Sequence, residues 1–403
     1  MKFLKLKELC TIKHGYAFNG KYITQQENNN ILVTPGNFKV GGGFKEDKCK
    51  YYNSKNIPKE YILNENDLIV TMTDLSKEAD TLGYSALIPQ KDKIYLHNQR
   101  IGLIKNINET IINKDYLYWY LRTRMYHNEI VATSTGTTVH HTSPERILNV
   151  KIPIYSLSIQ NKISKVLNII DNRIKINVQT NDNLYKILEQ YIKEHYYNNE
   201  FVRNGNVNDI GKIQGGYAFK SKDLLNETTN NKVLKIKNIS ASGVDIDNTQ
   251  CVYDEVANKV DKKFLLLRGN VIIAMTGAEL GKTGYLYGQD YRYFLNQRVG
   301  VIRGNDKYSE LYLNCLFILN DMQNTLNSKG YGSAQPNIST SDIENIEIPI
   351  PKEDELETFY EKCNPIYSKM ILNSEQNQSL TQLRDTLLPK LMNGEIDLDK
   401  IEI

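Results

Sequence analysis

The segment of this 403-residue chain that comes closest to a chemical motif is residues 276–283, Thr-Gly-Ala-Glu-Leu-Gly-Lys-Thr. It follows an apolar run and ends in Gly-Lys-Thr, as a phosphate-binding loop does. Such a loop needs four residues between its glycines so that backbone N–H groups can surround a phosphate, whereas Gly277 and Gly281 enclose only three. The spacing therefore predicts no nucleotide hydrolysis.

Two other segments invite a chemical interpretation, and neither has the neighbours that the chemistry needs. Residues 364–367 read Asn-Pro-Ile-Tyr rather than the Asn-Pro-Pro-Tyr of a methyltransferase, and Pro365 among helix-spaced apolar residues indicates a kink. His140 and His141 are the one adjacent histidine pair, without the clustered ligands of a metal or nuclease site. We expect no catalytic residue, no metal and no cofactor in this chain.

Composition restricts the classes of protein that the chain can belong to. Lys and Arg total 50 against 47 Asp and Glu, a net charge of +3, so any basic surface for nucleic acid must be local. Five widely spaced cysteines without a CxxC pair are typical of reduced thiols in the cytosol. The start lacks the apolar segment of a signal peptide, and no stretch approaches about 18 apolar residues. We expect a cytoplasmic protein without membrane contact.

The chain repeats itself once, because four segments recur in the same order. The matched pairs are residues 12–18 with 213–219, 67–73 with 270–276, 98–104 with 296–302, and 149–154 with 345–350. Small changes in spacing between the pairs are what insertions in surface loops produce. The sequence therefore predicts duplication of one fold, a pseudo-dimer within one chain.

Each copy carries short apolar runs broken by Gly, Asn and Asp, which are typical of β-strands. One helix is expected within each copy, at about residues 114–129 and about 309–327. The aromatic pairs Tyr16 with Phe18 and Tyr217 with Phe219 have strand spacing, which favours core positions.

A long helix is expected after each copy, because residues 156–197 and 352–392 are nearly free of glycine and carry apolar residues at helical spacing. These are Ile159, Ile163, Val166, Ile170, Ile174, Leu184, Ile187 and Tyr191 in the first, and Leu356, Phe359, Ile366, Met370, Leu380, Leu383 and Leu387 in the second. About 40 helical residues span roughly 60 Å, which exceeds the roughly 30–40 Å of a domain of about 150 residues. We expect the helices to pack on each other; the alternative is that each packs only on its own copy.

The predicted fold class is α+β. Two β-rich domains with some helix are separated by two long helices that form an intramolecular antiparallel coiled coil, with pseudo-twofold duplication. The predicted domains are residues 1–152 and 200–350, and the predicted spacer helices are residues 153–199 and 351–396.

Four signatures connect the chain with a known family. They are Gly-Tyr-Ala-Phe near the start of each copy, Asn-Gln-Arg-(Ile/Val)-Gly, Ile-Pro-Ile, and the closing residues 383–396, Leu-Arg-Asp-Thr-Leu-Leu-Pro-Lys-Leu-Met-Asn-Gly-Glu-Ile. Through them the whole chain resembles the specificity subunits of type I restriction-modification systems. The resemblance implies that each copy is a target-recognition domain for half of a bipartite site in double-stranded DNA. It also implies that the helices bind two methyltransferase subunits, which motor-nuclease subunits join. The first helix departs from the second, with Leu-Glu-Gln-Tyr at 188–191 where the second has Arg-Asp-Thr-Leu at 384–387.

Two pairs of loops occupy matching places in the copies but differ in sequence, as the reading of two different half-sites requires. The first pair is residues 73–77 with 276–283, and the second is residues 134–141 with 328–337. With the arginines of the two Asn-Gln-Arg segments, the candidate DNA-binding residues are Thr73, Asp74, Ser76, Lys77, Arg100, Thr137, Thr138, His140, His141, Thr276, Lys282, Thr283, Arg298, Ser333, Gln335 and Asn337. Arg100 and Arg298 are expected either to contact phosphate or to brace the loops.

The functional hypothesis is a non-catalytic DNA-specificity subunit. The alternative hypothesis is a scaffold whose domains and helices bind proteins and never DNA. DNA binding that weakens steeply with rising salt would separate the two.

Overall fold

The computed structural model describes residues 2–47, 49–90, 93–198, 202–240, 243–288, 290–329 and 336–396. The chain divides into two compact units, Met1–Asn172 with Thr381–Ile403, and Arg173–Leu380. Each unit therefore combines a β-rich part with segments of both long helices.

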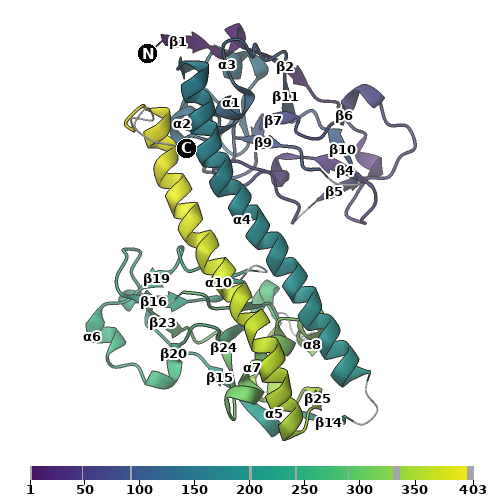
Figure 1. Ribbon diagram of the computed structural model, residues 1–403, viewed down its shortest axis with the longest axis vertical. Coiled ribbons are helices and arrows are strands. Elements are labelled where there is room, and N and C mark those ends of the chain that lie inside the picture. Colours follow the sequence, from purple (N-terminus) through teal and green to yellow (C-terminus); the bar gives the residue numbers. More distant parts are fainter. Residues whose placement is uncertain are drawn as a thin grey trace. The chain divides into compact units, whose positions relative to one another are not determined.

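The first unit is built on a four-stranded and a five-stranded sheet, ordered β2-β11-β7-β9 and β3-β5-β4-β10-β6, with the short pairs β1-β13 and β12-β8 (Figure 1). The strands are β1 Lys2–Lys5, β2 Thr11–His14, β3 Ile23–Thr24, β4 Asn30–Val33, β5 Lys50–Tyr52, β6 Ile62–Leu63, β7 Leu68–Thr71, β8 Thr73–Asp74, β9 Ser85–Leu87, β10 Ile94–His97, β11 Ile101–Lys105, β12 His140–His141 and β13 Lys151–Ile154. The helices are α1 Lys114–Tyr120, α2 Arg124–Ala132, α3 Pro144–Asn149 and the first part of α4 Leu157–Ile192.

The second unit contains two four-stranded sheets, ordered β15-β24-β21-β22 and β19-β16-β23-β20, with the pairs β14-β25 and β17-β18. The strands are β14 Arg203–Asn206, β15 Gly211–Gly215, β16 Asn231–Leu234, β17 Ile239–Ser240, β18 Gly243–Val244, β19 Gln250–Cys251, β20 Leu265–Leu266, β21 Val271–Ala274, β22 Thr283–Tyr285, β23 Arg292–Leu295, β24 Val299–Gly304 and β25 Glu347–Ile350. The helices are α5 Val207–Ile210, α6 Asp254–Ala257, α7 Lys307–Phe317, α8 Asn320–Lys329, α9 Thr340–Glu344 and most of α10 Glu353–Met392.

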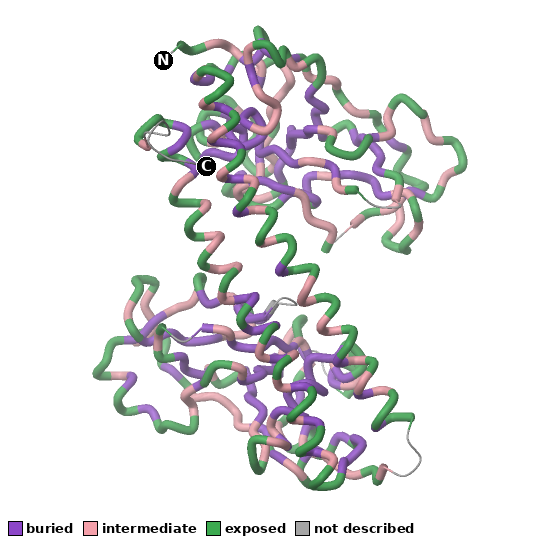
Figure 2. The backbone as a smooth tube through the Cα atoms, in the orientation of Figure 1, coloured by how far each residue is buried: buried purple, intermediate pink, exposed green. Residues whose placement is uncertain are grey.

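The strand order confirms the duplication. Sheet β2-β11-β7-β9 has the same order and the same antiparallel pairings as β15-β24-β21-β22. In the other sheet of each unit, one parallel pair, β4 with β10 or β16 with β23, lies beside an antiparallel strand, β6 or β20. The four strands β7, β11, β21 and β24 are largely buried (Figure 2), as their continuous apolar runs require.

The long helices α4 and α10 run antiparallel within each unit, as predicted. In the first unit, Tyr155, just before α4, donates to the carbonyl of Met392, while Asp171 accepts from Arg384. In the second unit, Asn177 donates to Gln376, and Asn181 to the carbonyl of Met370. In each unit, residues later in α4 contact residues earlier in α10. The two helices are therefore antiparallel in both units. The helix α10 is continuous through Pro365.

Two details of the helix predictions are wrong. Ile187 and Leu383 were expected among the apolar residues that the long helices bury, but they are 51% and 46% exposed. Leu188, next to Ile187, is fully buried instead. Each single helix expected within a copy is two helices, α1 with α2 and α7 with α8. In the first unit the break follows from Thr123, whose side chain accepts from the backbone N–H of Tyr126 and so caps a new helix.

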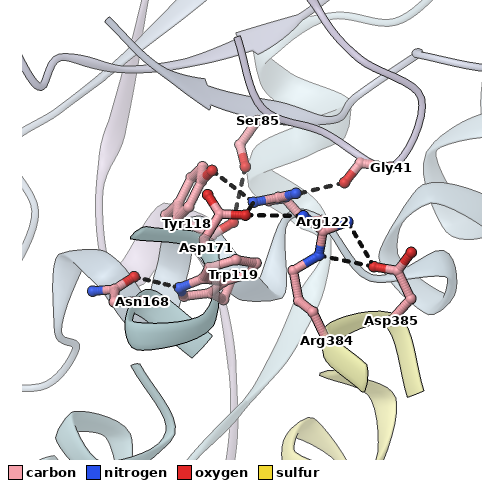
Figure 3. Close-up of polar contacts among 9 residues, drawn as sticks. All are labelled: Gly41, Ser85, Tyr118, Trp119, Arg122, Asn168, Asp171, Arg384 and Asp385. Atoms are coloured by element: carbon pink, nitrogen blue, oxygen red, sulfur yellow. Dashed lines mark hydrogen bonds and ion pairs between the residues drawn. The ribbon is translucent and has the colours of Figure 1, made fainter. Parts of the chain in front are cut away.

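A buried arginine joins the β-rich part of the first unit to both long helices (Figure 3). Arg122 donates to the carbonyl of Gly41 at 3.0 Å and to the hydroxyl of Tyr118 at 2.7 Å, and it lies over the ring of Trp119. Asp171 of α4 is 4.0 Å from Arg122 and also accepts from Arg384 of α10 at 2.9 Å. Through these contacts the loop at Gly41 is connected to α4 and α10 of the same unit.

Two general findings complete the fold. None of the five cysteines, all of which lie in the described residues, takes part in a disulfide bond. Among the described residues, no helix is both long and apolar enough to cross a bilayer.

Candidate nucleic-acid interface

The two predicted loops of the first unit lie side by side. The short strands β8 and β12 are antiparallel partners, with Thr73 opposite His141 and Asp74 opposite His140. Thr73 Oγ1 is 3.2 Å from Nδ1 of His141, and the ring of His140 is bonded to the carbonyl of Lys77 at 3.1 Å. Residues more than sixty positions apart in sequence therefore form one polar surface.

Within that surface, Thr73 and Asp74 are buried and hold the loop in shape. The Asp74 carboxylate accepts from the backbone N–H of Ser76 at 2.7 Å and from the N–H and hydroxyl of Thr81 at 2.6 and 2.5 Å. Burial raises the pKa of this carboxyl, but the hydrogen bonds from Thr81 and Ser76 outweigh it and leave the pKa below its ordinary value. The buried Asp74 side chain therefore stabilises the conformation of its own loop.

The other candidates of the first unit are open to solvent. Lys77, Thr137, Thr138 and His141 are exposed, while Ser76 and His140 are half-buried. Gly136 has φ of +95° and a Cβ there would approach the carbonyl oxygen of Val139 to 2.0 Å, so glycine is required for the turn. The exposed hydroxyl, ammonium and imidazole groups are donors and acceptors suited to base edges or phosphates.

The second unit brings its two loops together at the same place. Thr276 is bridged to Asn337, and the N–H of Gly277 donates to the carbonyl of Pro336 at 2.9 Å. Asn337 is exposed and Thr276 half-buried. Two further candidates, Ser333 and Gln335, lie outside the described residues.

Lys282 and Thr283 of the Gly-Lys-Thr segment in the second unit form contacts within the protein. Lys282 forms an ion pair with Glu279 at 2.7 Å. Thr283 is buried, donates to the carbonyl of Phe317 at 2.9 Å and accepts from Gln323. The threonine hydroxyl therefore both donates and accepts within the protein, and Lys282 is the member of the Gly-Lys-Thr that remains half-exposed.

The two Asn-Gln-Arg segments form the turns β10–β11 and β23–β24, beside the loops. The N–H of Met72 donates to the carbonyl of Arg100 at 2.9 Å, and the N–H of Met275 to that of Arg298 at 3.1 Å. Both arginine side chains are exposed, as are Gln99 and Gln297. The glutamines were not among the predicted residues, although their recurrence in both copies was a signal for them.

The paired aromatic residues divide between core and surface. Phe18 and Phe219 are each 8% exposed, as predicted for core positions. Tyr16 is 41% exposed and Tyr217 is half-buried, so the core prediction is wrong for Tyr16. Each tyrosine is bridged to the asparagine of the neighbouring turn, Asn98 or Asn296.

The described part of the site contains polar donors and cations. Among the described residues, no group of three or more His, Cys, Asp or Glu side chains is placed to hold a metal ion. The arrangement suits recognition by hydrogen bonds and charge.

Comparison with known proteins gives a consistent result along the chain. The model of the type I restriction modification DNA specificity domain matches twice, at residues 1–186 and 199–382. The MjaIX specificity subunit of a type I restriction enzyme from Methanocaldococcus jannaschii is 26% identical over 309 residues, 71% of this chain and 70% of the relative. The MjaVIII specificity subunit of the same organism is 22% identical over 358 residues, 84% and 81% of the two chains.

Among solved structures, the fold is similar to that of the S subunit of a type I restriction-modification system from M. genitalium. The TM-score is 0.59 at 17% identity, and the match covers 97% of this chain and 95% of the other.

Proposed function

Because the chain belongs to the type I restriction-modification DNA specificity family, we propose that each unit reads one half of a bipartite site in double-stranded DNA. The chain itself carries out no chemistry in this proposal and needs no cofactor. It acts in the cytoplasm, as the DNA-reading part of a methyltransferase and nuclease complex.

The observation that carries the proposal is the pairing of divergent loops on a common frame. Thr73 lies beside His141 in the first unit, and Thr276 beside Asn337 in the second. The framework strands match in order and direction, while the side chains of the paired loops differ between the units. Different donors and acceptors on one framework are what two different base sequences demand. A scaffold that never binds DNA finds no support in the family.

We propose that two methyltransferase subunits bind the long helices. Ile176 and Leu372 are both 50% exposed, and Ile187 and Leu383 are 51% and 46% exposed. In the duplicated sequence Ile176 matches Leu372, and Ile187 matches Leu383. Large apolar side chains in water at equivalent positions of both helices are the feature expected of two equal binding sites for one partner. Motor-nuclease subunits would join this core.

The proposal is tested by co-expressing the chain with its methyltransferase and mapping methylated bases in host DNA. A two-part motif is expected. Exchange of residues 1–152 for those of a relative should change one half of the motif and leave the other intact. A change in both halves, or stable assembly without any methylated motif, would contradict it.

A further inference from the structure

Both units present the same pair of polar side chains on the same turn. Gln99 and Arg100 in the first unit match Gln297 and Arg298 in the second, and all four are exposed. Within the described parts of the chain, neither guanidinium forms a hydrogen bond or an ion pair. Two arginines at equivalent surface positions therefore remain available for a ligand.

The turn that carries them is held firmly by the backbone. In the first unit, the N–H of Tyr16 donates to the carbonyl of His97 and the N–H of Gln99 donates to the carbonyl of Tyr16, both at 2.9 Å. In the second unit, Tyr217 donates to Leu295 at 2.8 Å and Gln297 to Tyr217 at 2.9 Å. The side chains thus project from fixed points, which lowers the entropy cost of binding.

Bracing of the loops is performed by the backbone and does not need the arginine side chains. The carbonyls of Arg100 and Arg298 accept from Met72 and Met275, the residues just before Thr73 and Thr276. These bonds place the turn next to the reading loops and leave each guanidinium unused. The arginines are therefore adjacent to the candidate DNA surface without being part of its internal support.

What the units share cannot distinguish two different half-sites, so shared exposed residues point to a ligand feature that is the same at both. In duplex DNA that feature is the phosphodiester backbone, which guanidinium groups recognise with two parallel hydrogen bonds. We propose that Arg100 and Arg298 are phosphate-contacting residues that position the duplex against each unit, whatever the base sequence, with Gln99 and Gln297 as neighbouring donors. This inference rests on the proposed function and divides its surface into positioning and base-reading parts.

The test uses the complete complex with its methyltransferase and two labelled duplexes of equal length. One carries the motif found by methylation mapping, and the other has both half-sites scrambled. Arg100→Gln and Arg298→Gln should each weaken binding of both duplexes by the same factor, roughly tenfold. Each should also make the plot of log affinity against log salt concentration shallower, with a negative slope smaller in magnitude by about 0.9. Thr138→Ala, in a divergent loop, should change the ratio between the duplexes instead.

Controls separate charge, folding and base reading. Arg124→Gln removes an exposed arginine of α2 and should leave affinity and slope unchanged. Arg100→Lys should recover part of the salt slope, because the charge remains, and none of these changes should lower thermal stability. An effect of Arg100→Gln on the motif duplex alone, no effect on either duplex, or an equal loss with Arg124→Gln would each overturn the assignment. Failure of the unaltered complex to bind DNA would instead refute the proposed function.

Discussion

The carbonyl oxygen of Asn98 lies 2.0 Å from the point that a Cβ atom on Gly15 would occupy. The same relationship recurs in the second unit, where the carbonyl oxygen of Asn296 lies 2.1 Å from a Cβ on Gly216. In each unit the glycine precedes the tyrosine that is bonded to the turn. The turn and the residue that follows β2 or β15 therefore approach each other more closely than any side chain permits. This contact explains why both copies have glycine at the first position of the Gly-Tyr-Ala-Phe signature.

Gly15→Ala is expected to destabilise the first unit by about 3 kcal/mol or more, because the added methyl group meets backbone that cannot rotate away. Denaturant unfolding of the purified chain measures the loss. Gly20→Ala is the matched control, since a Cβ there has nothing within 4 Å. Equal stability of the two variants would show that the turn can move and would weaken its description as a fixed support.

Arg122→Ala should lower the free energy of unfolding of the first unit by about 2–4 kcal/mol. The change removes the hydrogen bonds to Gly41 and Tyr118 and the contact with Trp119, and it takes the arginine donor from a half-buried carbonyl and a buried hydroxyl. Arg122→Lys should recover little, because an ammonium cannot reproduce the planar fork. Arg124→Ala, at an exposed position nearby, should be close to neutral.

The buried His97 should make the first unit acid-sensitive. Burial lowers the pKa of His97 from 6.5 to about 4, and its Nε2 is bonded to the carbonyl of Ile101 at 2.8 Å. The unfolded chain takes up this proton near pH 6.5, but the folded chain resists until about pH 4. The unfolded state therefore binds more protons in that window, and stability falls as the pH drops through it, by up to about 3 kcal/mol.

His97→Leu isolates this contribution, because Leu295 occupies the matching position of the second unit. Unfolding measured from pH 7 to pH 4 should be less pH-dependent in the variant than in the unaltered chain. Parallel pH profiles would mean that other groups cause the acid sensitivity.

The elements that are local in sequence were predictable. The duplication, the buried strands β7 and β21, and both long helices follow from repeated apolar runs and helical spacing. The choice between adjacent apolar residues did not follow, because Ile187 and Leu188 both lie at helical spacing from Leu184 and Tyr191. A turn of about 100° separates neighbouring helix positions, so only packing against a partner decides which one is buried.

The candidate site was predictable as two separate loops but not as one surface. The bridge between Thr73 and His141 joins positions far apart in sequence, and loop composition carries no signal for such a pairing. The burial of Asp74 and Thr283 was likewise hidden, since polar residues after a strand are usually exposed. The role of Arg122 depends on the carbonyl of Gly41, a partner that no local pattern indicates.

The exposed apolar residues of the helices lead to the last prediction. If Ile187 and Leu383 are equivalent contacts for two copies of one methyltransferase, a charge at either position should remove one copy and leave the other. Ile187→Lys and Leu383→Lys should each convert a complex with two methyltransferases into one with a single copy, and the double variant should bind none. Sizing of the co-expressed complex by light scattering measures the ratio.

Val178→Lys is the control, because Val178 is 46% exposed on the same helix but matches Ser374 in the duplicated sequence. Because Val178 has no apolar equivalent on α10, it is not part of a contact that both methyltransferases make. The Val178→Lys complex should therefore keep both methyltransferase copies. Lysine is a good helix former, and unchanged unfolding would show that the helices persist in all variants. Retention of two copies by the double variant would place the methyltransferase contacts elsewhere on the chain.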